Sequence, residues 1–449
     1  MRRIRQFYLR LKNYAVGSHE LSTLYFKQFS ITTVVRGLSV IISLLYVPIV
    51  LGFLDQEQYG IWVTLITLAN WIRVFDLGIG GGMRLKLSEA IAMKQYAQGR
   101  IYVSTTYGII GGVFILILVL FYFINPKLNW QSILNTSIIT QYELIQITTI
   151  SITFIIIGFI LQTVSLVYLA DGNSAAGAII QLLISSIILV LVWFASKWAV
   201  HGNLLLLAWI ATGTPVLVYA VVSVYTFLVK YPHFRPSIKL IKINETGNLI
   251  SLSLQVLVSS VTFMILYGSI PIIIAHLFSP NEVTIFNIAY SIYNVPIMVI
   301  GLVSAPFLPL VTLAYTKQDY MWIRDMLKKL NVVSLIIAGG TIIMIIISPW
   351  IFHIWIGDKV EIPFMLSVSI GIYAIISTLQ TPFSTFTNGT GKIKILTIFS
   401  PITIVMFISI SLILSRLLNN VIGVSIALSC ISLVMLIVLP LWLKKHLYY

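Results

Sequence analysis

Charged residues are scarce in this chain. Only 9% of its 449 residues are Asp, Glu, Lys or Arg, whereas a soluble domain carries about 25%. A chain this poor in charge cannot cover a water-facing surface, which excludes a soluble globular protein. Its mean hydropathy is +1.00, and continuously apolar runs of about 20 residues recur along it, too long and too uniform for barrel strands. The sequence therefore predicts an all-α integral membrane protein.

Cysteine is almost absent. The single cysteine, Cys430, excludes an intrachain disulfide or a cysteine-based metal site, and we interpret it as a small core residue. The six histidines are dispersed and form no H-E-x-x-H motif. We therefore expect no metal site and no bound cofactor.

Nucleotide-binding motifs are also lacking. The segment "FTNGTGKI", which begins at Phe386, fails as a P-loop because its first glycine is missing and Ile393 follows the lysine. The segment "GIGGGM", which begins at Gly78, fails as a dinucleotide fingerprint because Met83 occupies the last glycine position. These failures exclude a recognisable ATP motor. The longest outer loop, about Asn125–Glu143, is small for a catalytic loop that acts on lipid-linked sugars, which favours a transporter over an enzyme.

The apolar runs predict twelve transmembrane helices. Their expected spans are 28–51, 59–80, 101–124, 144–170, 175–196, 203–229, 249–277, 283–313, 331–352, 363–387, 395–415 and 420–443.

Basic residues are distributed unevenly between the two sides of these spans. With the N-terminus inside, inner segments hold 22 of the 28 Lys and Arg residues, and the outer loops hold only Lys127, Lys197, Lys359 and Arg416. Cytoplasmic loops of membrane proteins carry this excess. The sequence therefore predicts a membrane protein with both termini in the cytoplasm. The net charge of +15 is then attributed to the basic residues of the cytoplasmic segments, and we expect no nucleic-acid partner.

The two halves of the chain resemble each other at a shift near 224 residues. "LGFLDQEQYGIW" from Leu51 aligns with "AHLFSPNEVTIF" from Ala275, each a short acidic turn leading into a new helix. After six helices the chain again crosses the membrane in its original direction, so the halves are expected to be parallel repeats. We predict two six-helix lobes, residues 1–229 and 249–449, joined by a cytoplasmic linker, residues 230–248.

Two inner segments are expected to lie at the membrane surface. The glycines in "FDLGIGGGMRLKLSEA" (Phe75–Ala90) are expected to break the second helix and let the chain turn. "DYMWIRDMLKKL" (Asp319–Leu330) has one apolar and one charged face, which predicts a separate interfacial helix.

Two arginines fall within predicted spans. Arg36 lies about one third of the way into the first span, and Arg73 lies near the inner end of the second, three residues before Asp76. An arginine at the bilayer centre costs about 2.5–3.5 kcal/mol on insertion scales, so such residues usually face a cavity or a partner. We expect both arginines to bind an anionic substrate. For Arg73 an ion pair with Asp76 or snorkelling remains an alternative, and for Arg36 the alternative is a bond to a partner on another helix.

Other polar residues could line the same cavity, although Tyr and Asn also join helices to one another. The candidates are Asn70, Gln255, Tyr267, Asn287, Tyr290 and Asn294. Asp76 is the candidate for ion coupling.

The stretch "FDLGIGGGMRLKLSEA" closely resembles a segment at the end of the second helix in Wzx-type O-antigen and capsule repeat-unit flippases. That family commonly reads D-L-G-I-G-N-G-L-R-N-K-L. The chain departs from it at Gly81, Met83 and Leu85 and matches it at Asp76, Leu77, Gly78, Ile79, Gly80, Gly82, Arg84, Lys86 and Leu87.

The resemblance extends to chain length, span number and topology. It implies the V-shaped fold of the multidrug/oligosaccharidyl-lipid/polysaccharide (MOP) exporter superfamily. It also implies a flippase that moves undecaprenyl-pyrophosphate-linked oligosaccharides to the outer leaflet of a bacterial inner membrane, with a polysaccharide polymerase and a chain-length regulator as partners. Three rivals remain: a MATE-type small-molecule exporter, a lipid II flippase, which usually has two more helices, and a membrane polymerase, which would need a larger outer loop.

Overall fold

The computed structural model describes residues 19–72, 78–198, 202–242, 261–262, 264–391 and 394–447. The predicted residues Arg73, Asp76 and Gln255 lie outside these ranges. The described part of the chain contains helices and no strand.

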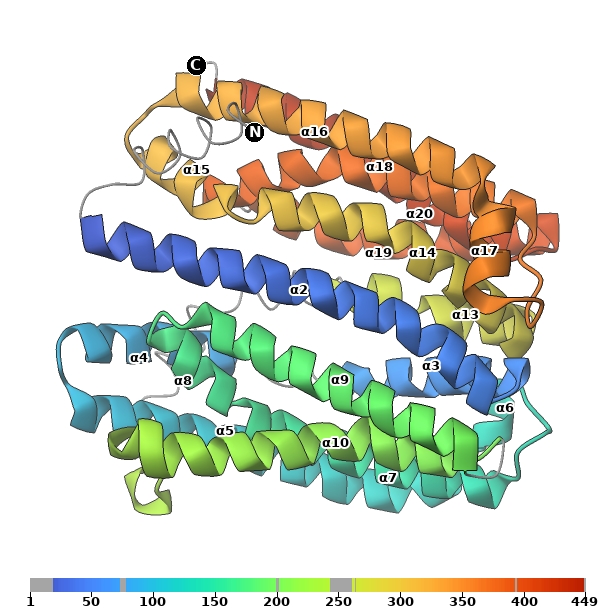
Figure 1. Cartoon of the computed structure of the whole chain (residues 1–449), viewed down its shortest axis with the longest axis horizontal. Helices are drawn as coiled ribbons and strands as arrows, with labels where there is room; N and C mark the ends of the chain where they lie inside the picture. Colours follow the sequence, from blue (N-terminus) through green and yellow to red (C-terminus); the bar gives the residue numbers. More distant parts are fainter. Residues whose placement is uncertain are drawn as a thin grey trace.

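Two groups of helices form two lobes, one from each half of the chain (Figure 1). The first lobe holds α2 (His19–Phe53), α3 (Gln56–Asn70), α4 (Ile79–Ala92), α5 (Tyr96–Ile124), α6 (Trp130–Leu134), α7 (Gln141–Gln162), α8 (Val164–Ala170), α9 (Ser174–Trp198) and α10 (Leu204–Tyr225). The second holds α13 (Ile270–Leu277), α14 (Pro280–Ser304), α15 (Phe307–Thr316), α16 (Tyr320–Ile346), α17 (Ser348–Ile356), α18 (Phe364–Gly389), α19 (Lys394–Leu418) and α20 (Ile422–Leu447).

Ten helices in the described residues are long and apolar enough to cross a membrane. The two other expected spans, 59–80 and 249–277, are each interrupted by residues outside the described ranges. Large apolar side chains are exposed along the outer sides of the helices, as a hydrocarbon environment requires. The predicted fold class, an all-α multi-pass membrane protein with two lobes, is confirmed.

Polar caps fix where several helices begin. Asp55 accepts a hydrogen bond from the backbone of α3, and Thr140, Asn203 and Ser279 do the same for α7, α10 and α14. Such caps satisfy backbone N–H groups that have no partner within the helix. Short polar residues in the loops therefore set the register of the apolar runs that follow them.

The predicted second span is broken near the glycine-rich stretch, since α3 ends at Asn70 and a new helix, α4, begins at Ile79, but three of the four glycines do not lie at the break. Only Gly78 has left-handed backbone geometry (φ 74°), and Gly80, Gly81 and Gly82 lie inside α4. α4 packs against the other helices of the first lobe through Met83, which is buried. Gly80, Gly81 and Gly82 are therefore part of a packed helix, and of the four glycines only Gly78 precedes it.

The predicted interfacial helix at Asp319–Leu330 is also wrong. It is the first part of α16, which continues into the membrane span without interruption. Its apolar face packs into the second lobe, where Ile323, Met326 and Leu330 are buried. The apolar side of the amphipathic pattern therefore reflects packing within the protein.

The segment that follows α10 is held along the first half of α5. Arg100 donates from Nε to the carbonyl of Arg235 at 2.8 Å, and the backbone of Ser237 donates to Ser104 Oγ at 3.0 Å. Phe234 is only 1% exposed. The described part of the predicted linker is therefore anchored to the first lobe.

Replacing Phe234 with alanine should release this segment. Removing a buried phenylalanine costs about 3–5 kcal/mol, so tryptic cleavage at Lys239 should accelerate by about a hundredfold or more. Ile238→Ala is the matched control, because Ile238 is 88% exposed. Equal cleavage of the two variants would contradict the anchoring role of Phe234.

Candidate functional site

The two lobes meet through α3 and α14 at the end of the molecule where both helices begin. The hydroxyl of Tyr59 donates to Asn287 Oδ1 at 3.0 Å, and Thr284 Oγ1 donates to the carbonyl of Gln56 at 2.6 Å. Both bonds join the first lobe to the second. We call this contact the interlobe latch.

The latch has almost no free space at its centre. A Cβ atom built on Gly60 would lie 1.8 Å from the carbonyl oxygen of Pro280. Two backbones can approach this closely only where one residue has no side chain. Gly60 therefore permits the contact between α3 and α14.

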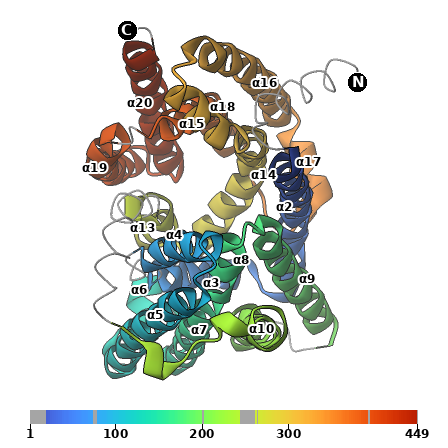
Figure 2. The same ribbon diagram turned by 90° about the vertical axis from the view of Figure 1, so that its left-hand side faces the viewer.

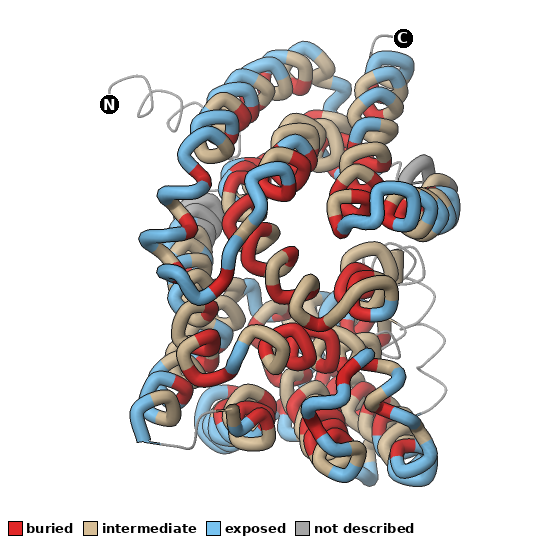
Figure 3. Tube along the Cα trace, turned by 90° about the vertical axis from the view of Figure 1, so that its right-hand side faces the viewer, coloured by how far each residue is buried: buried red, intermediate tan, exposed pale blue. Residues whose placement is uncertain are grey.

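Further hydrogen bonds close the same end. Asn135 Nδ2 donates to the carbonyls of Ala275 and Phe278 at 2.9 and 3.1 Å, and Trp355 Nε1 donates to the carbonyl of Leu44 at 2.9 Å. Viewed from this end, buried segments gather where the lobes meet (Figure 3). We call it the closed end. At the opposite end, where α4 and α15 lie, the helices of the two lobes are spread apart (Figure 2).

A small pocket of about 110 Å³ lies beside the latch, between α3, α13 and α14. It brings together three residues predicted to line a cavity, Tyr267, Asn287 and Tyr290, with Thr67 from the first lobe. The hydroxyl of Tyr267 lies 3.1 Å from that of Tyr373. Asn287 has a second role that was not predicted, because its Oδ1 holds the latch.

A larger pocket of about 590 Å³ lies between α2, the α8–α9 corner and α14, so both lobes form its wall. We call it the arginine pocket. Its lining residues are Arg36, Ser39, Val40, Leu169, Ser174, Gly177, Ala178, Gln181, Met298, Gly301 and Leu302.

Among the described residues that line this pocket, Arg36 is the only charged one. Its side chain is exposed to the pocket, and it forms no ion pair or hydrogen bond with a described residue. Arg36 lies 17 residues before the end of α2, or about 25 Å along the helix from the closed end. A guanidinium group presents five donors that match phosphate or carboxylate oxygens. The arrangement can therefore hold an anion deep between the lobes.

One face of α14 connects the two pockets. Asn287, Tyr290, Asn294, Met298 and Gly301 recur at intervals of three or four residues and so share that face. The first two line the small pocket, and the last two line the arginine pocket. Asn294 lies between them and is half-buried. The predicted polar residues of α14 thus form a continuous stripe.

Asn70 does not line either pocket. Its amide donates to the carbonyl of Ile66 at 2.7 Å, within its own helix. Conversely, three residues that were not predicted line the arginine pocket, namely Ser39, Ser174 and Gln181. Gln181 could have been found, since it is an amide inside an otherwise apolar span.

The architecture can be compared with solved structures. An inward-facing structure of a multidrug resistance MATE family transporter of the MOP superfamily matches with a TM-score of 0.74 and 13% identity, over 91% of this chain and 94% of that one. An outward-facing structure of a MATE family transporter matches with a TM-score of 0.65 and 14% identity, over 95% of each chain. The fold is that of MATE transporters.

A third solved structure has the same fold. A MOP superfamily transporter from Pyrococcus furiosus, whose binding pocket of reverse polarity suggests a different function, matches with a TM-score of 0.64 and 12% identity over 95% of each chain. The sequence matches no protein-family model and no curated protein. The MATE fold is therefore established by structure alone.

Proposed function

We propose that this protein is a flippase that moves an undecaprenyl-pyrophosphate-linked oligosaccharide, an O-antigen or capsule repeat unit, across the bacterial inner membrane. The observation that carries this proposal is Arg36, which pairs with no described residue and lies in a pocket whose wall belongs to both lobes. A pyrophosphate would accept several of its hydrogen bonds, and charge-assisted bonds to phosphate are among the strongest in proteins. Arg73 is proposed to hold the same group.

The polarity of the pockets favours an anion. Of the described residues that line the two pockets, none is acidic. A MATE-type exporter of cationic drugs, which shares the fold, would favour a carboxylate at this place. The small-molecule exporter remains the second candidate because the fold is common to both.

The stripe on α14 supports a sugar substrate. A hydroxyl moved into hydrocarbon without a partner costs about 4–8 kcal/mol on the alkane scale, so an oligosaccharide needs a polar route. Asn287, Tyr290 and Asn294 offer amide and hydroxyl groups along that face. The lipid chain would meanwhile stay in the bilayer.

The direction of transport follows from the predicted orientation. With basic segments inside, the closed end faces the periplasm, and the structure represents a state that accepts substrate from the cytoplasmic side. The higher TM-score to an inward-facing transporter agrees with this assignment. An inside-negative potential favours outward movement of negative charge by about 2.3 kcal/mol per charge and 100 mV. A polymerase and a chain-length regulator would consume the product outside.

A transport assay in vesicles tests the proposal. Purified protein is reconstituted with a polyprenyl-pyrophosphate-linked oligosaccharide, and exposure of the sugar to an added glycosidase is followed with time. We expect protein-dependent exposure of the sugar and no uptake of a fluorescent cationic drug in parallel vesicles. Drug uptake without sugar exposure would instead support the exporter.

Asp76 is proposed to couple transport to protons. If so, transport by the natural protein should vary with pH, and Asp76→Asn should remove that dependence. Initial rates of sugar exposure between pH 5 and pH 8 are the measurement. Transport by the natural protein that does not change with pH would exclude this role.

A further inference from the structure

The second lobe contains a pocket of about 230 Å³ where α16 begins and α20 ends, at the opposite end of the molecule from the closed end. We call it the basic pocket. It is large compared with the roughly 30 Å³ that a water molecule occupies in the liquid, so it has room for a group of several heavy atoms. Its lining residues come from α16, α18 and α20 and are Arg324, Leu327, Lys328, Asn331, Phe383, Pro440, Leu443 and Lys444.

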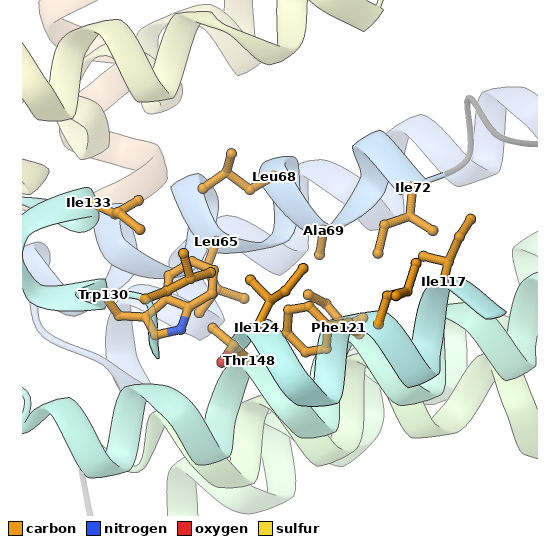
Figure 4. A pocket seen from close by; sticks show the side chains of 13 residues that line it. Leu65, Leu68, Ala69, Ile72, Ile117, Phe121, Ile124, Trp130, Ile133 and Thr148 are labelled. Atoms are coloured by element: carbon orange, nitrogen blue, oxygen red, sulfur yellow. The ribbon is translucent and has the colours of Figure 1, made fainter. Parts of the chain in front are cut away.

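Charge distinguishes the basic pocket from a pocket of about 530 Å³ between α3, α5, α6 and α7 in the first lobe (Figure 4). The side chains that line the latter are hydrocarbon apart from Trp130 and Thr148. Both of these donate hydrogen bonds to Asn125 Oδ1, at 2.7 and 3.0 Å, so that wall offers no group that selects a particular ligand. In the basic pocket, by contrast, three of the described lining residues are cations and none is acidic.

The three cations come from two helices. Arg324 and Lys328 lie one turn apart on α16, and Lys444 lies near the end of α20. Neither lysine forms an ion pair with a described residue. Like charges gathered in one pocket repel one another, and an anion bound between them would remove that cost. Arginine and lysine are also the side chains that bind phosphate oxygens most strongly.

The basic pocket also contains a hydrogen-bond acceptor that the protein leaves unused. Asn331 Oδ1 is buried and accepts no hydrogen bond from the described residues. Buried side-chain oxygens usually have a donor, either from the protein or from an ordered water, and a hydroxyl group of a ligand supplies one equally well. The donors of the three cations and the acceptor of Asn331 together suit a phosphodiester that carries a hydroxylated alcohol such as glycerol.

The basic pocket lies outside the space between the lobes. Figure 2 shows α16 and α20 on the side of the second lobe that faces away from the first lobe, with α18 between them. Arg324 lies four residues after the start of α16, and Lys444 lies three residues before the end of α20. These separations are about 5–6 Å along each helix axis. The cations are therefore placed at the ends of membrane helices, where lipid head groups meet the protein.

Apolar surface continues from the basic pocket along both helices. On α16, the exposed Leu335 follows Asn331 on the same face. On α20, Ile437 and Leu433, both exposed, share a face with Pro440. An acyl chain can lie along this surface while its head group occupies the pocket. A free phosphate would use the cations but gain nothing from the apolar surface.

We propose that the basic pocket binds the head group of an anionic phospholipid of the phosphatidylglycerol type, with its acyl chains along α16 and α20. The phosphate accepts hydrogen bonds from the three cations, and a glycerol hydroxyl donates to Asn331 Oδ1. Phosphatidylethanolamine carries no net charge and gains less from the cations. The predicted orientation assigns the bound lipid to the cytoplasmic leaflet. This inference goes beyond the proposed transport function and does not depend on it.

Native mass spectrometry of the full-length protein in detergent tests the lipid preference. The protein is titrated with dioleoyl-phosphatidylglycerol or with dioleoyl-phosphatidylethanolamine, which have the same acyl chains, and the fraction that carries one lipid gives each dissociation constant. Each basic side chain strengthens binding of anionic lipid by about fivefold, so we expect phosphatidylglycerol to bind more tightly by at least that factor. Equal affinity of the two lipids would overturn the inference.

Glycerol 3-phosphate separates a lipid site from a site for a small phosphate. Added at the same concentration as phosphatidylglycerol, it should leave the lipid bound, because it has no chains to contact the apolar surface of α16 and α20. Displacement of the lipid by glycerol 3-phosphate would instead assign the pocket to a soluble phosphate compound and reject the lipid site.

A matched pair of double variants locates the lipid. Lys328→Gln with Lys444→Gln should weaken binding of phosphatidylglycerol by about 25-fold, or fivefold for each cation removed. Lys239→Gln with Lys445→Gln is the control, because it removes the same charge from exposed lysines of the predicted cytoplasmic segments that do not line the pocket. Equal weakening in both pairs would show attraction to basic surface in general and reject the site. The comparison of the two lipids uses the natural protein, so it decides the matter even if a variant does not fold.

Discussion

Replacing Gly60 with alanine should hold the closed end open and stop transport. The added Cβ atom would lie 1.8 Å from the carbonyl oxygen and 2.6 Å from the carbonyl carbon of Pro280, and backbone atoms cannot rotate away as a side chain can. Overpacking of this kind costs about 1–3 kcal/mol. Because the clash exists only when α3 meets α14, the cost falls on the closed state and not on folding of either lobe. The population of that state should fall by roughly 5–150-fold.

Solvent access to the latch measures this effect. A cysteine introduced at Asn287, in a background without Cys430, should react with a water-soluble maleimide faster in Gly60→Ala than with glycine at position 60. Gly112→Ala is the matched control, because a Cβ on Gly112 of α5 would meet nothing within 4 Å. Unchanged reactivity together with normal transport would show that α3 and α14 need not meet during the cycle.

The sequence predicts the overall fold well because membrane helices follow local rules. Continuous apolar runs identify the spans, and basic residues orient them, without any knowledge of long-range contacts. Two predictions were wrong, a helix break at Gly80–Gly82 and a separate interfacial helix at Asp319–Leu330, and both were made from local composition. In both places the deciding factor is packing against other helices, which buries Met83 and Ile323. No local pattern reports such a contact.

The candidate site could be predicted only in part. Arg36 stands out because a charge within an apolar run is costly, and the structure places it in an interlobe pocket. Asn287 and Asn70 look alike in sequence, yet one holds the other lobe and the other bonds to its own helix. Gly60 gives no sequence signal, because its importance comes from a residue 220 positions away.

Replacing Arg36 with alanine should lower transport of the lipid-linked sugar by about 10–150-fold. A hydrogen bond to a charged group contributes about 1.5–3 kcal/mol, and the described residues lining the arginine pocket offer no second cation to take its place. Arg36→Lys should recover part of the activity, since lysine keeps the charge but loses the paired donors. The measurement is the initial rate of sugar exposure at equal protein abundance.

Arg416→Ala provides the control for charge alone. Arg416 is an exposed arginine in the last turn of α19 and lines none of the described pockets, so its removal should leave the rate unchanged. Because the guanidinium group of Arg36 offers paired donors, the rate of sugar exposure should be highest with arginine at position 36, lower with lysine and lowest with alanine. If all three support the same rate, the arginine pocket does not bind the pyrophosphate, and the argument for an anionic lipid-linked substrate loses its main support. A cation exporter would show no loss in the alanine variant, because its substrate gains nothing from a guanidinium group.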